Sequence, residues 1–378
     1  MTALDLSLDV SAVPVHPGGA GQYTLALARG LVARPDVSLT LVARRGDAAR
    51  WDEMGAARVL SDVPSSRPGR LAFEQVGLPA VLRSAGVTVH HGPHYTMPAR
   101  SPVPVAVTIH DCTFFDHPEW HLRSKAAFFR RAIRRAALRA DVLICVSGVT
   151  AERLAANVTV RAPVIVAPHG VDHDRFSPSE PSAGADGALL HGLGVPLDRP
   201  LVTFVGTLEP RKGVVPLVAA FDALAASRPD VMLVLAGQPG WGMAETEQAL
   251  AAARHADRIV RTGYVPDAAV PALLRQSAAV AYPALEEGFG LPALEALACG
   301  APLVTTEGTA MAELAGAAAL LVPPGSVTPL AEALETALDQ GRHSERRESG
   351  FAVAAARTWR ASVDEHLRAY ALAVSASQ

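Results

Sequence analysis

Two glutamates, two glycines and a predicted helix start lie close together in one stretch, YPALEEGFGLPALEALACG from Tyr282 to Gly300. The glycines allow tight backbone turns, and no Ser, Thr, Asp or Asn caps the helix predicted to begin near Pro292. The open N–H groups and the helix dipole favour an anion such as phosphate. Glu287 and Glu295 would repel a phosphate, so their carboxylates are suited to hydroxyl groups. The stretch therefore has the chemistry of a sugar nucleotide site.

A structural explanation of the same residues stays open. Acidic residues are common near helix starts because of the dipole, which accounts for Glu295. Glu286 and Glu287 would then belong to an ordinary surface loop.

A pair of cations forms the second group of interest. Leu201–Val205 predicts a buried strand, and GTLEPRKGV follows it, so Gly206, Arg211 and Lys212 come after a strand end. There the two cations would neutralise the acidic turn at Glu287 and bind phosphate oxygens. Adjacent basic residues on a loop are also commonly solvated, and this alternative stays open.

Two further groups follow predicted strands in the first half of the chain. Gly18 and Gly19 come after Leu4–Val13, where a phosphate could approach the backbone, although the spacing is not GxGxxG and a plain tight turn explains it equally well. His110 and Asp111 end the apolar strand of VAVTIHD. Ligands of parallel sheets bind at such strand ends. A buried histidine bonded to a neighbour is the structural alternative.

The elements that must position these residues are short apolar strands alternating with helical segments, which predicts an α/β fold with parallel sheets of the Rossmann type. The 378 residues predict two domains. A net charge of −3 gives no general attraction to nucleic acid. Three cysteines indicate a reducing compartment, hence a cytoplasmic protein. No secretory signal and no membrane-spanning helix are expected.

Residues 121–140 carry seven lysines and arginines and no acid, with aromatic and aliphatic residues between them. This is the pattern of a basic amphipathic helix. It predicts either the solvated face of a packing helix or a contact with anionic lipid or a phosphorylated acceptor. Peripheral contact with the inner face of a membrane is thus one hypothesis for 121–140.

Seven residues separate Glu287 from Glu295, with GFG between them, and this resembles the signature of retaining glycosyltransferases of the GT-B fold, family 4. Ordered matches occur at the glycine loop, IHD, EPRKG and a terminal helix. HPEW resembles the mannosyltransferase-like branch. The resemblance implies two Rossmann-like domains facing across a cleft, with a C-terminal helix crossing back to the first. The expected limits are 1–176 for the acceptor domain, 177–200 for a linker, 201–355 for the donor domain and 356–378 for the returning helix.

The resemblance also implies roles. Glu287 would hold hydroxyls of the donor sugar, Glu295 the ribose, and His110 would face the donor sugar. The expected catalytic residues are His110, Arg211, Lys212 and Glu287. The expected donor contacts are Gly18, Gly19, Gly206, Arg211, Lys212, Tyr264, Val265, Glu287, Gly288, Phe289, Gly290, Leu291 and Glu295. An acceptor region is expected around Asp111, His117 and Trp120.

The expected function is transfer of a hexose, with mannose from GDP-mannose preferred, to a glycan, lipid or small-molecule acceptor without a cofactor or a metal. Asp172 and Asp174 match the DxD metal motif only superficially, since the resemblance makes them a turn at the end of the first domain. A UDP-sugar transferase, a catalytically silent GT-B subunit and a nicotinamide-dependent oxidoreductase are the alternatives. Wrong glycine spacing counts against the last.

Overall fold

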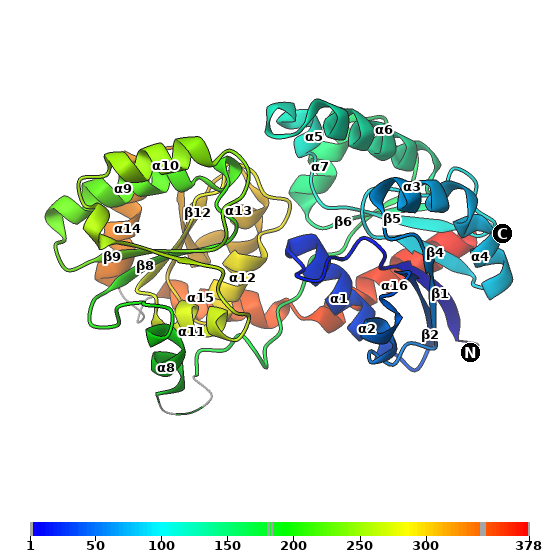
Figure 1. Ribbon diagram of the computed structural model, residues 1–378, viewed down its shortest axis with the longest axis horizontal. Coiled ribbons are helices and arrows are strands. Elements are labelled where there is room, and N and C mark those ends of the chain that lie inside the picture. The colour runs from blue at the N-terminus through cyan, green and yellow to red at the C-terminus, as the bar shows by residue number, and fades with distance from the viewer. Residues whose placement is uncertain (1–2, 180–181, 183, 341–344, 377–378) are drawn as a thin grey trace. The chain divides into compact units, whose positions relative to one another are not determined.

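The computed structural model describes residues 3–179, 182, 184–340 and 345–376, whose helices and strands are drawn in Figure 1. The chain divides into two compact units. Unit 1 comprises Met1–Gly170 and Trp359–Gln378, and unit 2 comprises Val171–Thr358. Each unit has its own parallel sheet with helices, which confirms the predicted α/β fold with two Rossmann-like domains.

Unit 1 has a seven-stranded sheet of order β3-β2-β1-β4-β5-β6-β7, in which each pair is parallel. The strands β5 and β6 are buried at every residue, and so they read as continuous apolar runs. Its strands are β1 Leu4–Asp9, β2 Val37–Arg44, β3 Arg58–Val63, β4 Val89–Gly92, β5 Val105–Ile109, β6 Val142–Cys145 and β7 Val164–Val166. Its helices are α1 Gly19–Val32, α2 Ala48–Asp52, α3 Arg67–Val76, α4 Leu78–Ala85, α5 Thr113–Asp116, η1 Pro118–Trp120, α6 Arg123–Arg139, α7 Gly148–Asn157 and α16 Trp359–Ala376.

Unit 2 has a six-stranded parallel sheet of order β10-β9-β8-β11-β12-β13. Its strands are β8 Leu201–Val205, β9 Met232–Ala236, β10 Ile259–Gly263, β11 Ala279–Tyr282, β12 Leu303–Thr306 and β13 Ala319–Val322. Its helices are α8 Ala185–His191, η2 Pro210–Lys212, α9 Val214–Ser227, α10 Met243–Ala252, η3 Ala256–Arg258, α11 Ala269–Gln276, α12 Leu291–Ala298, α13 Ala310–Ala315, η4 Gly316–Ala318, α14 Thr328–Gln340 and α15 Glu345–Ala356.

In both sheets the strand order reverses once. The reversal lies between β1 and β4 in unit 1 and between β8 and β11 in unit 2. At such a point the loops that leave the two strands run to opposite sides of the sheet, and the space between them receives ligands. The topology therefore predicts that ligands bind between the loops after β1 and β4 in unit 1, and between the loops after β8 and β11 in unit 2.

The C-terminal helix α16 belongs to unit 1, as the predicted return of the chain requires. It packs on α1 so closely that a Cβ on Gly30 would lie 2.6 Å from Val363 Cγ2. Its polar face enters a buried hydrogen-bonded network that reaches β4, β5 and α1. The network runs from Tyr370 Oη to His91 Nδ1 (2.8 Å), His91 Nε2 to Thr108 Oγ1 (2.7 Å), Thr108 Oγ1 to Tyr23 Oη (2.8 Å), Tyr23 Oη to His366 Nε2 (2.8 Å) and His366 Nδ1 to the Ser362 carbonyl (2.7 Å).

Two boundaries differ from the expected ones. Within residues 177–200, expected as a linker, α8 belongs to unit 2, where the buried Asp186 binds Arg275 through two oxygens at 2.6 and 2.7 Å and Leu190 packs in the core. The terminal helix is interrupted before Trp359, because the Arg357 carbonyl accepts the Val171 N–H at 2.9 Å and Thr358 pairs with Val171.

Candidate active site

The loops after β8 and β11 are joined directly at the reversal point of unit 2. The Leu285 N–H donates to the Arg211 carbonyl at 2.8 Å. Gly213 has φ +70°, and a Cβ there would lie 2.0 Å from the Pro283 carbonyl oxygen. Only glycine permits this close approach, because both the left-handed conformation and the missing side chain are needed. The loop that carries the two cations is therefore fixed against the loop that carries Glu287.

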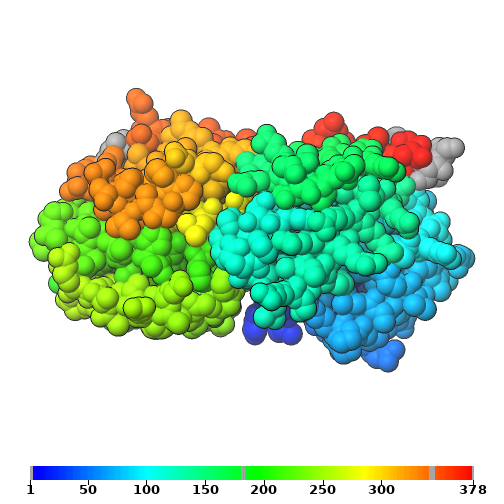
Figure 2. All heavy atoms as spheres, turned by 90° about the horizontal axis from the view of Figure 1, so that it is seen from above, coloured from blue at the N-terminus to red at the C-terminus, as the bar shows by residue number. Residues whose placement is uncertain are grey.

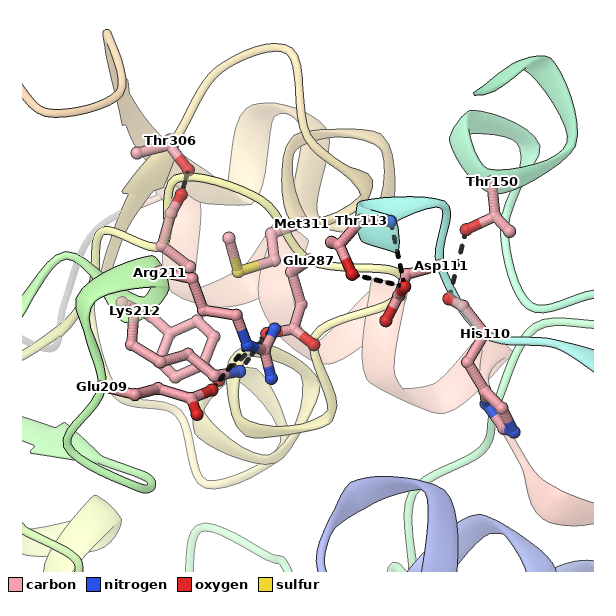
Figure 3. Close-up of polar contacts among 12 residues, drawn as sticks. His110, Asp111, Thr113, Thr150, Glu209, Arg211, Lys212, Glu287, Thr306 and Met311 are labelled. Carbon is pink, nitrogen blue, oxygen red and sulfur yellow. Dashed lines mark hydrogen bonds and ion pairs between the residues drawn. The ribbon is translucent and has the colours of Figure 1, made fainter. Parts of the chain in front are cut away.

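Lys212 is the centre of this site, and Figure 3 shows it with Arg211, Glu209 and Glu287. Its side chain is only 9% exposed. The amine donates to Tyr282 Oη at 2.7 Å and forms an ion pair with Glu287. A buried amine with such partners is fixed in position, so the cation points at a defined place beside the β11 loop.

Arg211 completes the cluster from the more exposed side. Its Nη1 lies 3.4 Å from Glu287 Oε2, and its Nε lies 2.5 Å from Glu209 Oε1. Two cations thus face two carboxylates within hydrogen-bonding distance. An arriving diphosphate would find both cations partly neutralised, so its binding has to compete with Glu287 and Glu209 for them.

Burial and charge act in opposite directions on this pair. Burial lowers the pKa of Lys212, and the charge of Glu287 opposes that change. Burial alone would raise the pKa of Glu287, but the charges of Lys212 and Arg211 outweigh it and hold that pKa below its ordinary value. Glu287 therefore stays a carboxylate, which accepts hydrogen bonds and can hold hydroxyl groups.

The helix α12 begins beside this cluster, after Gly288, Phe289 and Gly290. Gly290 has φ +95°, a conformation that glycine adopts without cost. No side chain among the described residues caps this helix, and the carbonyl of Gly290 accepts the N–H groups of Ala293 and Leu294. The dipole still favours an anion at this end. The helix predicted to follow the β11 loop is therefore present, and Leu291 is its first residue.

Glu295 is the fifth residue of α12 and lies in its second turn, not in the first as expected, because the helix begins at Leu291, one residue before Pro292. Burial raises its pKa to about 7, although Arg175 lowers it and Asp267 raises it slightly. Arg175, and Asp267 in the loop after β10, are thus charged groups that lie close to Glu295. A carboxyl group with this pKa changes charge near neutral pH.

The other residues expected to contact the donor include three that follow strand ends of the same sheet. Gly206 directly follows β8, and a Cβ on Gly237 would lie 1.9 Å from its carbonyl oxygen. Tyr264 follows β10 and is half exposed, whereas the Val265 side chain is buried in the core of the unit. A ligand would therefore have to contact Val265 through its backbone, and the expected donor contact of this residue stays a prediction.

Unit 1 holds a cavity of about 370 Å³ at its own reversal point. Gly18 and Gly19 line it, as expected of the glycine loop. The other walls come from β1, from α1, from the segment after β4 and from α3 and α6. They include Asp9, Gly21, Arg67, Arg70, Leu71, Glu74, Pro93, His94, Tyr95, Thr96, Phe128 and Phe129. We name this space the unit 1 cavity.

His110 is next to this cavity but is already bonded. Its Nε2–H donates to the carbonyl of Pro93, a cavity residue, at 2.7 Å, so Nδ1 is the acceptor nitrogen of the neutral ring. Burial lowers the pKa of His110 below its ordinary value. Both the structural alternative and the binding role are compatible with this geometry, since the bond to Pro93 orients the ring.

The three residues of the expected acceptor region lie elsewhere in the described part of unit 1. Asp111 Oδ1 accepts the N–H and hydroxyl of Thr113, the first residue of α5, at 3.1 and 2.8 Å. His117 stacks on Trp120 in the turn η1, with ring centroids 3.8 Å apart. None of the three lines the unit 1 cavity. Their contacts support the local turn, and any acceptor contact through them remains a proposal.

Several cavity residues were missed from the sequence. His94 and Tyr95 follow β4, and the rule that placed candidates at strand ends would have selected them, had β4 been treated as the partner of β1. Arg67, Arg70 and Glu74 lie on α3 and carry no such signal, because a charged residue on a helix is usually solvated.

Both halves of the chain match known families of glycosyltransferases. Residues 17–175 match Glycosyltransferase Family 4, and residues 190–350 match Glycosyl transferases group 1. The chain is 27% identical over 372 residues to O-antigen chain mannosyltransferase B of Escherichia coli, covering 94% of this chain and 96% of that protein. It is 37% identical over 183 residues to a GDP-mannose-dependent alpha-(1-6)-phosphatidylinositol monomannoside mannosyltransferase of Mycolicibacterium smegmatis, covering 46% of each.

Solved structures share the fold of the whole chain. Sucrose-phosphate synthase from Thermosynechococcus elongatus superposes with a TM-score of 0.78 at 18% identity, covering 97% of this chain and 98% of that one. Anabaena HepE in complex with UDP-glucose gives 0.75 at 20% identity, covering 97% and 99%.

Proposed function

Because this chain belongs to the family 4 glycosyltransferases of the GT-B fold, we propose that it is a retaining hexosyltransferase that takes mannose from GDP-mannose. The donor is assigned to unit 2 and the acceptor to unit 1. The observation that carries the assignment is the buried cluster of Arg211, Lys212 and Glu287 at the reversal point between β8 and β11. The two mannosyltransferase relatives support mannose, and one of them is named as GDP-mannose-dependent.

The cluster accounts for departure of the leaving group. As the bond from the sugar to the diphosphate breaks, negative charge grows on the phosphate oxygens, and only interactions that strengthen at that moment accelerate the reaction. Arg211 and Lys212 are already fixed by Glu209, Tyr282 and Glu287, so little reorganisation is needed to stabilise that charge. The N-terminal end of α12 adds to the favourable field.

The acids act on hydroxyl groups in this proposal. Glu287 stays ionised beside the cations and accepts hydroxyls of the donor sugar, and Glu295 accepts those of the ribose. The family resemblance assigns His110 to the donor sugar, and the bond to the Pro93 carbonyl orients its ring. We assign no nucleophile, because the acceptor hydroxyl attacks the face that the leaving group vacates.

A UDP sugar is the second candidate donor, since HepE, which shares the fold, was solved with UDP-glucose. Thermal unfolding with GDP and with UDP separates the two. A ligand at 100 times its dissociation constant stabilises the protein by about 2.7 kcal/mol. Stabilisation by GDP alone supports GDP-mannose, and stabilisation by UDP alone selects the alternative.

Hydrolysis of the donor tests catalysis without any knowledge of the acceptor. Purified protein should release GDP slowly from GDP-mannose, and the Lys212→Ala variant should release far less. A protein that binds GDP but releases none would be the silent subunit, and a protein that neither nucleotide stabilises would refute the donor site itself.

Residues 121–140 are also proposed to bring the enzyme to an anionic membrane surface. No helix in the described part of the chain is both long and apolar enough to cross a bilayer. Sedimentation with vesicles of phosphatidylglycerol and phosphatidylcholine tests this contact, and binding that does not depend on phosphatidylglycerol would refute it.

A further inference from the structure

The cations of α6 fall into two groups that differ in their partners. In the first group the side chains of Lys125, Arg130 and Arg134 lie over the rings of Phe114 and Phe115, 5.1 to 5.9 Å from the ring centres. Arg130 Nε also donates to the Phe114 carbonyl at 2.6 Å. These three cations have partners within unit 1, so the ordinary packing explanation accounts for this group.

The second group has a single polar contact among the described residues, from Arg135 Nη1 to Gln75 Oε1 at 3.5 Å. Arg131, Arg135 and Arg139 follow one another at four-residue intervals, which places them in one row along the helix. They line a second cavity of about 660 Å³ between α3 and α6. Figure 2 looks onto this part of unit 1, where the teal spheres of α6 border the blue spheres of residues 60–80. We name this second space the α3–α6 groove.

Apolar side chains also line the α3–α6 groove, namely Leu71, Ala72, Met97, Phe128 and Leu138. Phe128 is 37% exposed and Leu138 is 45% exposed, although both are large hydrophobic side chains. A groove lined by both apolar side chains and a row of arginines fits a ligand that has a hydrocarbon part and an anionic group.

The groove adjoins the unit 1 cavity. Leu71, Glu74, Thr96 and Phe128 line both spaces. Arg67 and Arg70 line the unit 1 cavity on the other side of this shared wall. Thr96 Oγ1 donates to Glu74 Oε2 at 2.6 Å and Gln75 Nε2 donates to Glu74 Oε1 at 2.8 Å, so the one acid in the shared wall is already bonded.

We propose that the acceptor is a lipid phosphate, with its hydrocarbon in the α3–α6 groove, its phosphate among the arginines of α3 and α6, and its acceptor hydroxyl in the unit 1 cavity. This inference rests on the proposed function, because it names the substrate class of the same enzyme. It differs from a general membrane contact, since one molecule enters a defined groove.

Water-soluble dihexanoyl phosphatidic acid is the probe, because it is monomeric and offers no membrane surface. Calorimetric titration of the full chain should show saturable binding. The R131Q/R135Q/R139Q variant should bind at least about tenfold more weakly, since each cation near an anionic lipid is worth about 1 kcal/mol, a factor of about five. Absence of saturable binding to the unmodified protein would overturn the proposal.

The matched control is R123Q/K125Q/R134Q, which removes three charges from exposed positions of the same helix but leaves the groove intact. It should bind the probe as the unmodified protein does. Equal loss in both variants would overturn the proposal in favour of a general charge effect. Stronger loss in the groove variant alone supports it.

Two further ligands separate the sources of binding. Inorganic phosphate carries the charge without the hydrocarbon, and dihexanoyl phosphatidylcholine carries the hydrocarbon without net charge, so both should bind at least about tenfold more weakly. Phosphate binding as tight as that of phosphatidate would identify a free-phosphate site and overturn the proposal. Donor hydrolysis by all variants should stay unchanged, so a failure here is distinct from a failure of the donor site.

Discussion

Each unit carries a buried polar cluster, and the two clusters are built on opposite principles. In unit 2, Arg211 and Lys212 face Glu209 and Glu287, so the cluster consists of charges at the end of a sheet. In unit 1 the network from Tyr370 to His366 consists of neutral rings and hydroxyls in the middle of the core. Charges at a strand end can exchange partners with a ligand, whereas a neutral network inside the core cannot.

The unit 1 network has one consistent set of proton positions. The Ser362 carbonyl only accepts, so His366 Nδ1 donates to it and His366 Nε2 accepts from Tyr23. The hydroxyls and rings beyond must then point the same way, and Tyr370 donates to His91 at the far end. Every bond is made with neutral groups, which indicates that this network stabilises the docking of α16.

The largest expected difference comes from Lys212→Met, which keeps most of the length of the side chain and removes the charge. Turnover should fall about 10²–10³-fold, because one preorganised donor at the developing charge is lost. Arg254→Met is the control, since it breaks an ion pair with Asp222 at 72% exposure in the same unit. Steady-state rates and thermal midpoints measure both. Equal rates for Lys212→Met and the unmodified protein would remove Lys212 from the mechanism.

The donor side of this comparison was accessible from the sequence, because its residues directly follow short apolar strands. Glycines at turns, cations after Val205 and acids after Tyr282 could be placed at one sheet edge without coordinates. The network of unit 1 was not predictable, since Tyr23, His91 and His366 come from distant segments and look like ordinary residues of two helices and a strand. Only the three-dimensional fold joins them.

The strands, too, could be predicted only in part from the sequence. The central strands were predicted because both of their faces are buried and they read as apolar runs. The edge strands β3 and β10 were missed, because most of their residues are only partly buried and polar residues interrupt the pattern. The α3–α6 groove was likewise hidden: the seven cations of 121–140 were visible, but which of them have aromatic partners depends on where Phe114 and Phe115 pack.

A pair of tyrosine variants applies the same chemical change to both clusters. Tyr370→Phe leaves His91 Nδ1 without its donor, so the free energy of unfolding should fall by about 1–3 kcal/mol with turnover unchanged. Tyr282→Phe removes an acceptor from Lys212, so turnover should fall, by about tenfold for a bond to a charged group. Urea unfolding and donor hydrolysis measure the two effects. If both variants changed the same quantity, the contrast between the clusters would be wrong.

Glu295 gives unit 2 a titration near neutral pH. Its pKa is raised to about 7, so it loses its charge as the pH falls through that value and no longer accepts hydroxyls with two charged oxygens. The KM for the donor should therefore rise below pH 7, by up to about tenfold per pH unit, while it stays constant above. Glu295→Gln should have a high KM that no longer changes between pH 6 and 8. A pH-dependent KM in that variant would assign the titration to another group.

The buried histidines of unit 1 titrate in the acid range, and their protonation should lower the stability of the fold. We expect this effect to be the smallest, and it contrasts with the effect of Glu295 on the donor KM. Burial lowers the pKa of His366 from 6.5 to about 4, so the folded chain stays neutral where the unfolded chain takes up a proton. The stabilising contribution is thus complete above pH 6.5 and is lost as the pH falls toward 4, at about 1.4 kcal/mol per pH unit for this histidine. Urea unfolding at pH 7, 6 and 5 measures how the free energy of unfolding changes with pH. The His366→Gln variant should reduce that change by the amount expected for one proton. It should leave the pH dependence of the donor KM unchanged. If that variant instead altered the KM profile and left the slope intact, the two clusters would be coupled, and the separation of a reactive edge in unit 2 from a structural core in unit 1 would have to be given up.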